Sequence, residues 1–151
     1  MGIAEPDPAA VLATIGWEAR TPPVRITAGW DTLLWRFQGS GGRDHALRLY
    51  RHDPDNPRQA VAAAQEELSM RAARTGGLPV PEVEATGVYE TAPFFVLEWM
   101  PGIVLSDAAK STPWRIPRLA QAFGAAQARL HRLPPPDGLL ARGNDWLDRY
   151  V

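Results

Sequence analysis

Residues 94–102 have the sequence FFVLEWMPG, and this stretch decides the fold of the chain. Its apolar run predicts a buried strand, which Pro101-Gly102 breaks abruptly. A second apolar run, ALRLY at 46–50, predicts another strand that carries one cation, Arg48. Taken alone, the first stretch is equally well explained as a plain buried strand that ends in a Pro-Gly turn.

The patterns on either side place these two strands in a longer series. Glycines at 39–42 predict a flexible hairpin turn, and short turns between the first three strands indicate an antiparallel meander. Asn56 as N-cap and Pro57 at the first helical position predict a helix that stops at Gly76-Gly77. The predicted strands cover 24–27, 32–37, 45–50, 83–89 and 94–99, and the predicted helices cover 7–17, 57–74, 117–133 and the start of another from 144.

This order of elements predicts an α+β fold in two parts. Residues 1–101 would form a five-stranded antiparallel sheet with one main helix, preceded by a leading helix. Residues 102–151 would leave a hinge at 99–102 and form the first helices of an incomplete helical part. The helix over 117–133 is amphipathic, with apolar residues at alternating spacings of four and three, namely Leu119, Phe123, Ala126, Leu130 and Leu133.

The composition is that of an ordinary globular chain. The 151 residues are 45% hydrophobic and 22% charged, and the formal net charge is −1. This balance gives no reason to expect nucleic acid or an anionic membrane as a partner. The sequence has no cysteine, no signal-peptide pattern at its start and no apolar run near the roughly 18 residues of a membrane span, so we expect a cytoplasmic location and no membrane partner.

Ala46 and Arg48 form the first candidate site. Alternate side chains of a strand share a face, so these two should point the same way. The small Ala46 would leave room for a flat ring, and the Arg48 cation could meet phosphate oxygens. An exposed arginine on a solvated sheet face would explain the same residues.

Glu66 and Glu67 lie on the predicted helix that comes next, where helical geometry can aim only one of them at the sheet. Glu66 shares a helix face with Met70 and Ala73, which favours it as the inward carboxylate and as a partner for the strand cation. A solvated pair of glutamates is the alternative interpretation.

Three further segments are candidates for binding chemistry. The strand end from Glu98 to Met100 could hydrogen-bond a purine through its backbone C=O and N–H groups. The turn that contains Gly29 could close over phosphates, although an ordinary hairpin turn explains it equally well. The acidic run at 53–56 resembles a metal-binding run, but helix capping accounts for it, so we predict no metal site.

Taken in order, these segments resemble the amino-terminal half of the aminoglycoside phosphotransferase and choline kinase-like superfamily. The matching stretches are AGWDT at 28–32, ALRL at 46–49, Glu66, GLPVP at 77–81, FVLEWMPG at 95–102 and ARLH at 128–131. Their combination and order are more specific than any single stretch, and together they span roughly residues 20–150.

That family has a kinase-like fold and transfers the γ-phosphate of ATP or GTP to a hydroxyl of a small molecule. The resemblance implies that Arg48 binds phosphates and that Glu66 is its ion-pair partner. It also implies that Leu97 gates the pocket behind the purine, which the Glu98 C=O and the Met100 N–H would hold. The complete set of implied nucleotide contacts is Ile26, Gly29, Ala46, Arg48, Glu66, Leu97, Glu98 and Met100.

The chain departs from the family pattern at two places. Arg48 stands where lysine is commoner, but an arginine keeps its charge when buried and can grip phosphate with two donors. The family's catalytic loop contains His-Gly-Asp followed by an Asn, and a later Asp binds Mg²⁺. None of the three histidines here precedes Gly-Asp, so we expect no catalytic residue, no Mg²⁺ ligand and no phosphoryl transfer by these residues alone.

A fragment or truncated product of a longer kinase is the most economical explanation of this pattern. The rival is a non-catalytic module that binds a nucleotide or a protein partner through the same sheet. The acceptor stays open among antibiotics, choline-like molecules, sugars and amino alcohols. Because the apolar stripe of the helix over 117–133 would lack its usual packing partners, we expect self-association through it, coverage by the leading helix, or partial disorder.

Overall fold

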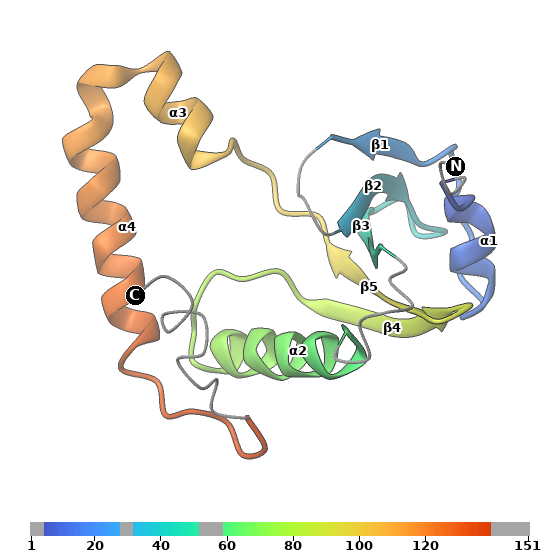
Figure 1. Ribbon diagram of the computed structural model, residues 1–151. Coiled ribbons are helices and arrows are strands. Elements are labelled where there is room, and N and C mark those ends of the chain that lie inside the picture. The colour runs from blue at the N-terminus through green and yellow to red at the C-terminus, as the bar shows by residue number, and fades with distance from the viewer. Residues whose placement is uncertain (1–4, 28–31, 52–58, 140–151) are drawn as a thin grey trace, which may run out of the picture.

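The computed structural model describes residues 5–27, 32–51 and 59–139 (Figure 1). The predicted order of strands and helices is confirmed within these residues, and two short elements, α3 and η1, are additional. The starts predicted at Asn56-Pro57 and at 144 lie outside the described residues. The elements are α1 (Pro8–Ala13), β1 (Val24–Ile26), β2 (Thr32–Gln38), β3 (Asp44–Tyr50), α2 (Gln59–Thr75), β4 (Val83–Tyr89), β5 (Ala92–Glu98), α3 (Leu105–Ser111), η1 (Pro113–Arg115) and α4 (Ile116–Leu130).

The five strands form one antiparallel sheet in the order β1-β2-β3-β5-β4. This confirms the α+β prediction of a five-stranded antiparallel sheet. β3 lies at its centre, paired with β2 across the glycine turn and with β5 on its other side. In that turn Gly42 adopts a φ of 75°, which a glycine reaches without strain. The strand that carries Arg48 is therefore the middle strand of the sheet.

Several predicted boundaries were wrong by a few residues. The leading helix ends at Ala13 rather than at 17, because a turn comes next in which Gly16 has a φ of 71°. β5 begins at Ala92 and includes Pro93, which pairs with Val88 of β4. A proline can enter a strand where the ladder does not need its missing N–H. Pro93 therefore belongs to the strand, although the sequence analysis had placed it in the preceding turn.

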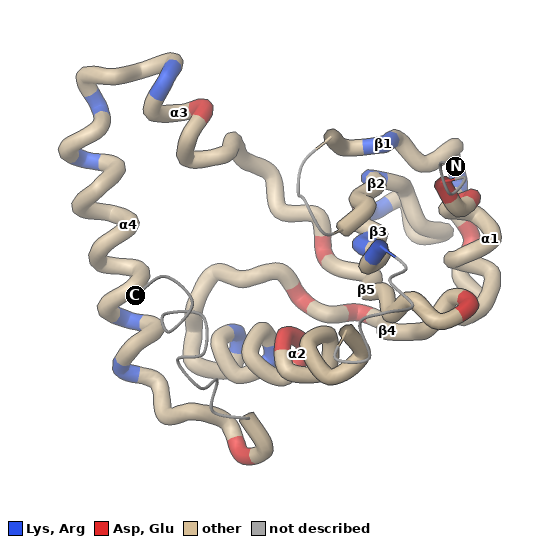
Figure 2. The backbone as a smooth tube through the Cα atoms, viewed as in Figure 1, with Lys and Arg blue, Asp and Glu red and all other residues tan. Residues whose placement is uncertain are grey.

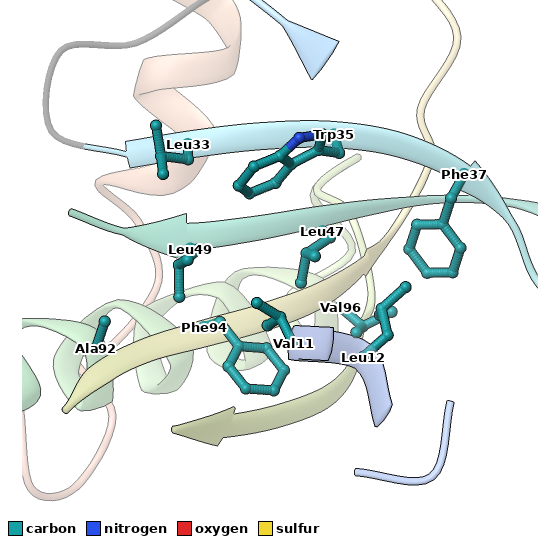
Figure 3. Close-up of a cluster of buried hydrophobic side chains, with 10 residues drawn as sticks. All are labelled: Val11, Leu12, Leu33, Trp35, Phe37, Leu47, Leu49, Ala92, Phe94 and Val96. Carbon is teal, nitrogen blue, oxygen red and sulfur yellow. The ribbon is translucent and has the colours of Figure 1, made fainter. Parts of the chain in front are cut away.

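The larger core lies between the sheet and α1. Figure 3 shows these side chains clustered on one side of β2, β3 and β5, with Val11 and Leu12 of α1 among them. Alternate residues of the strands supply the cluster, as the two-residue period of a strand requires. Its buried members are Val11, Leu12, Leu33, Trp35, Phe37, Leu47, Leu49, Ala92, Phe94 and Val96.

The opposite face of the sheet lies against α2 and has a smaller core. Ala46 and Ala63 are buried there, where their small side chains let the helix approach the sheet. Val83, Phe95 and Leu97 complete the buried cluster. α2 ends where it was predicted to end, before Gly76-Gly77. This face therefore combines an apolar centre with the charged side chains of α2.

α3 and α4 stand apart from the sheet, and an extended segment after β5 leads to them (Figure 1). The amphipathic helix predicted over 117–133 is present as α4, and none of its residues is buried. Phe123 is 51% exposed and Leu130 is 48% exposed. The predicted apolar stripe is thus open to solvent in the single chain.

The end of α4 and the segment after it contact α2 and the turn that follows α2. Arg129 donates a hydrogen bond to the Gly77 carbonyl at 2.8 Å. Gln65 donates through its side-chain amide to the Gly138 carbonyl at 3.2 Å. The helical part is therefore connected to the sheet part by contacts as well as by the chain after β5.

Candidate functional site

Four of the residues predicted from the sequence lie at adjacent positions on the α2-facing side of the sheet. Ile26 of β1 is opposite Leu34 of β2, and Leu34 is opposite Arg48 of β3. Ala46 is opposite Leu97 of β5. Directly paired residues point to the same face, and the two-residue period brings Arg48 and Ala46 to a common face. The structure thus brings together Ile26, Ala46, Arg48 and Leu97.

The predicted partner of the strand cation is also in place. The guanidinium of Arg48 forms an ion pair with the carboxylate of Glu66 from α2, and their side chains are 22% and 34% exposed. Glu67, the neighbouring carboxylate, instead pairs with Arg71 on the outer side of the helix at 2.9 Å. The prediction that Glu66 is the inward glutamate is confirmed.

Tyr50 joins this pair as a third member that the sequence analysis missed. Its hydroxyl donates to the Glu66 carboxylate, and Arg48 donates to the Tyr50 oxygen at 3.4 Å. Burial raises the pKa of the Tyr50 hydroxyl, and the hydrogen bond and charge of Glu66 raise it further, so this group remains a proton donor. Its position two residues after Arg48 on one strand was the signal that could have revealed it.

One donor of the Arg48 guanidinium is left over in this arrangement. Its Nε is buried and has no hydrogen-bond partner. The rings of Tyr50 and Phe95 have centroids 5.7 and 5.6 Å from the guanidinium carbon. Burial acts to lower the pKa of Arg48, but the hydrogen bond and charge of Glu66 outweigh it and raise that pKa.

A permanently charged arginine with a free, buried donor fits an anionic ligand. A buried donor without an acceptor costs about 1–3 kcal/mol, and an oxygen of a phosphate would remove that cost. Ala46 lies further along the same face and is buried in the cluster that contains Ala63 and Leu97. The chemistry of Arg48 therefore suits an anionic group such as a phosphate.

The segment predicted to hold a base comes directly after β5. The Trp99 N–H donates to the Asp44 carbonyl at 3.3 Å, which continues the pairing with β3 by one residue. The guanidinium carbon of Arg36 lies 4.8 Å from the centroid of the Trp99 ring, close enough for a cation–π contact. Met100 is 42% exposed, so its backbone lies near solvent at the margin of the site.

Arg74 near the end of α2 holds this strand end, and sequence reasoning missed it. One of its terminal nitrogens donates to the Glu98 carboxylate at 2.9 Å and to the Val80 carbonyl at 3.0 Å. The other donates to the Glu82 carboxylate at 3.0 Å. Charged residues of both signs gather along α2 and the neighbouring strands (Figure 2). No local motif marks Arg74, because its partners lie 6 to 24 residues away in sequence.

Gly29, expected to close over phosphates, lies outside the described residues. Among residues 5–27, 32–51 and 59–139, no three His, Asp or Glu side chains form a group that could hold a metal ion. Within the same ranges, no helix is long and apolar enough to cross a membrane.

The comparison with protein families agrees with this arrangement. The model of the phosphotransferase enzyme family, APH, matches residues 24–151. The chain belongs to this family. The match confirms the resemblance that was based on the segments between residues 28 and 131. It begins at β1, so it includes the whole sheet and α2 of this member of the phosphotransferase family. A search of the curated proteins finds no match to it.

Proposed function

We propose that residues 1–151 form the nucleotide-binding part of a phosphotransferase that moves the γ-phosphate of ATP or GTP to a hydroxyl of a small molecule. The observation that carries this proposal is the Arg48–Glu66 pair, with the Arg48 Nε buried and unpartnered on the face that Ala46 and Leu97 share. Membership of the phosphotransferase family supports the reaction class.

Each residue would have a distinct part in binding. Arg48 would bind the phosphates as a permanent cation, and Glu66 would hold the guanidinium in place so that binding does not have to order it. Ile26 and Ala46 would contact the flat base, and Leu97 would limit the depth of its pocket. The Glu98 carbonyl and the Met100 N–H would bond the edge of the base.

These residues bind but do not complete the chemistry. In the reaction, the acceptor oxygen forms a bond to the γ-phosphorus while the bond to the departing diphosphate breaks, and a base takes the hydroxyl proton. The 151 residues contain no His-Gly-Asp, and the described ones supply no metal site. The proposal is therefore that residues 1–151 bind nucleotide without transferring phosphate.

Calorimetric titration with ATP tests this function. We expect measurable binding that Arg48→Ala weakens by about 10- to 100-fold, the range of one charge-assisted hydrogen bond. Arg43→Ala is the matched control, because the Arg43 side chain is 79% exposed and its ion pair is with Glu84, at 3.8 Å. Absence of ATP and GTP binding to the wild-type chain would contradict the proposal and favour a protein-interaction module.

A further inference from the structure

The hydrogen bonds at the end of β5 depart from a regular antiparallel ladder at Glu98. The Glu98 N–H donates to the Glu82 carbonyl at 2.9 Å. In a regular pair of this kind, the Glu82 N–H would return a hydrogen bond to the Glu98 carbonyl. Here the Glu82 N–H donates instead to the carboxylate oxygen Oε2 of Glu98, at 3.2 Å. The side chain of Glu98 thus takes the place of its own carbonyl.

Arg74 holds the Glu98 carboxylate in that position. Its Nη1 donates to the same Oε2 of Glu98 at 2.9 Å, and its other nitrogen holds the Glu82 carboxylate at 3.0 Å. The Glu82 N–H lowers the pKa of the Glu98 carboxyl, and Arg74 lowers it further, which keeps the acceptor charged. Since the Glu98 side chain is 44% exposed, it would turn into solvent without this arginine.

We infer that Arg74 is a positioning residue that makes the nucleotide site select adenine over a 6-oxopurine, by keeping the Glu98 carbonyl out of the ladder. This inference rests on the proposed function, because it concerns the base of the same nucleotide. A backbone carbonyl is an acceptor only, and adenine presents an amino donor at its 6-position where guanine and hypoxanthine present an oxygen. A free Glu98 carbonyl therefore attracts adenine and repels the other two.

The same arrangement predicts the effect of losing Arg74. With the carboxylate released, the Glu82 N–H would bond the Glu98 carbonyl and complete the ladder. The carbonyl would then offer the base less of its acceptor capacity, and the preference for adenine would fall. Phosphate binding at Arg48 would remain, because Arg48 is held by Glu66 and Tyr50 instead.

ATP and ITP differ at the 6-position of the base and in the proton that hypoxanthine carries on N1, and titration with both tests the inference on the full chain. We expect the wild type to bind ATP at least tenfold more tightly than ITP, of which about tenfold is the worth of the hydrogen bond at the 6-position. Arg74→Ala should lower this ratio by about tenfold while tripolyphosphate affinity changes less than about twofold. Arg71→Ala is the matched control on the same helix, because Arg71 pairs with Glu67; it should keep the wild-type ratio.

Two other variants keep the test decisive if Arg74→Ala does not fold. Glu98→Ala retains the backbone carbonyl but removes the carboxylate, so it should lower the preference for ATP by the same factor as Arg74→Ala. Arg74→Lys retains one charged donor and should restore part of the preference.

The outcomes separate the two proposals. A wild type that binds neither ATP nor ITP refutes the proposed function and this inference with it. A wild type that binds both equally well, or an ATP-to-ITP ratio that survives in Arg74→Ala or Glu98→Ala, overturns the inference and leaves the proposed function standing. A fall in ATP, ITP and tripolyphosphate affinity by one common factor also overturns it, since Arg74 would then be merely structural.

Discussion

Glu66 and Glu67 are adjacent in sequence, yet neutralising them should have different effects on the free energy of unfolding. Glu66 faces Arg48 in a partly buried ion pair, whereas Glu67 faces Arg71 on the helix surface. Glu66→Gln keeps the shape of the side chain and an acceptor for Tyr50 but removes the charge opposite Arg48. The comparison therefore isolates the value of the inward ion pair.

The expected loss of unfolding free energy depends on how exposed each ion pair is. Two charges 4 Å apart attract by about 4 kcal/mol at an effective dielectric constant near 20, and the cost of removing them from water offsets most of this. Exposed pairs contribute about 0.2–1 kcal/mol, whereas breaking buried pairs costs about 3–5 kcal/mol. With side chains 22% and 34% exposed, the Arg48–Glu66 pair lies between these limits, and we expect Glu66→Gln to cost about 1–2 kcal/mol.

For Glu67→Gln we expect a loss of only about 0.3–0.5 kcal/mol, typical of a surface pair one helical turn apart. Urea denaturation monitored by circular dichroism at low salt and in 1 M NaCl measures both values. High salt should remove the effect of Glu67→Gln and preserve most of the effect of Glu66→Gln, because partly buried pairs are screened less. Equal losses of unfolding free energy for the two variants, or equal salt dependence, would refute the argument that only Glu66 forms a partly buried ion pair with the sheet.

Three other outcomes are expected. Gly87→Ala should destabilise the fold by about 1–3 kcal/mol, because the added methyl group would lie 2.5 Å from the Phe94 ring. Gly41→Ala, where no atom lies within 4 Å of the added methyl group, should change the unfolding free energy by less than about 1 kcal/mol. Equal effects of the two variants in denaturation would contradict this packing. Because the pKa of the Glu98 carboxyl is lowered, its contribution to stability is present above the ordinary glutamate pKa and is lost as the pH falls through the lowered pKa. The unfolding free energies of wild type and Glu98→Gln should therefore differ at pH 7 and converge as the pH falls, as denaturation over a series of acidic pH values would show; a difference that stays constant with pH would contradict this. Because the apolar stripe of α4 is exposed, light scattering should give a mass above 16.6 kDa that falls on Phe123→Glu, and a concentration-independent monomer would contradict self-association.

The sequence predicted the sheet because its strands and turns carry strong local signals. The Gly-rich turn and the apolar runs identify neighbouring strands without any knowledge of distant contacts. Glu66 could also be assigned, since Met70 and Ala73 mark the buried side of its helix and Ala73 is indeed buried. Local periodicity is thus sufficient where one element decides the orientation of a residue.

The parts that sequence reasoning missed depend on contacts between distant segments. Arg74 has an ordinary place in the last turn of a helix, and only the folded chain brings it to Glu98 and to the segment that precedes β4. Tyr50 was hidden differently, because a tyrosine at the end of an apolar strand predicts packing as well as it predicts a hydrogen bond. The use of a side chain in place of a backbone carbonyl at Glu98 has no sequence signature.

The contacts between the end of α4 and α2 restrict how the helical part can move. One attachment is the extended segment after β5, and the other is the meeting of Arg129 with Gly77, where the Leu133 side chain also lies against Gly76. The hydrogen bond from Gln65 to the Gly138 carbonyl is a third contact, but it holds the segment after α4 and not the helix itself. A rigid body held at two separate points keeps one rotational freedom, about the line that joins them. Domain closure in this chain should therefore proceed about a single swing axis rather than a free pivot, and α4, about 22 Å long, would sweep an arc around it.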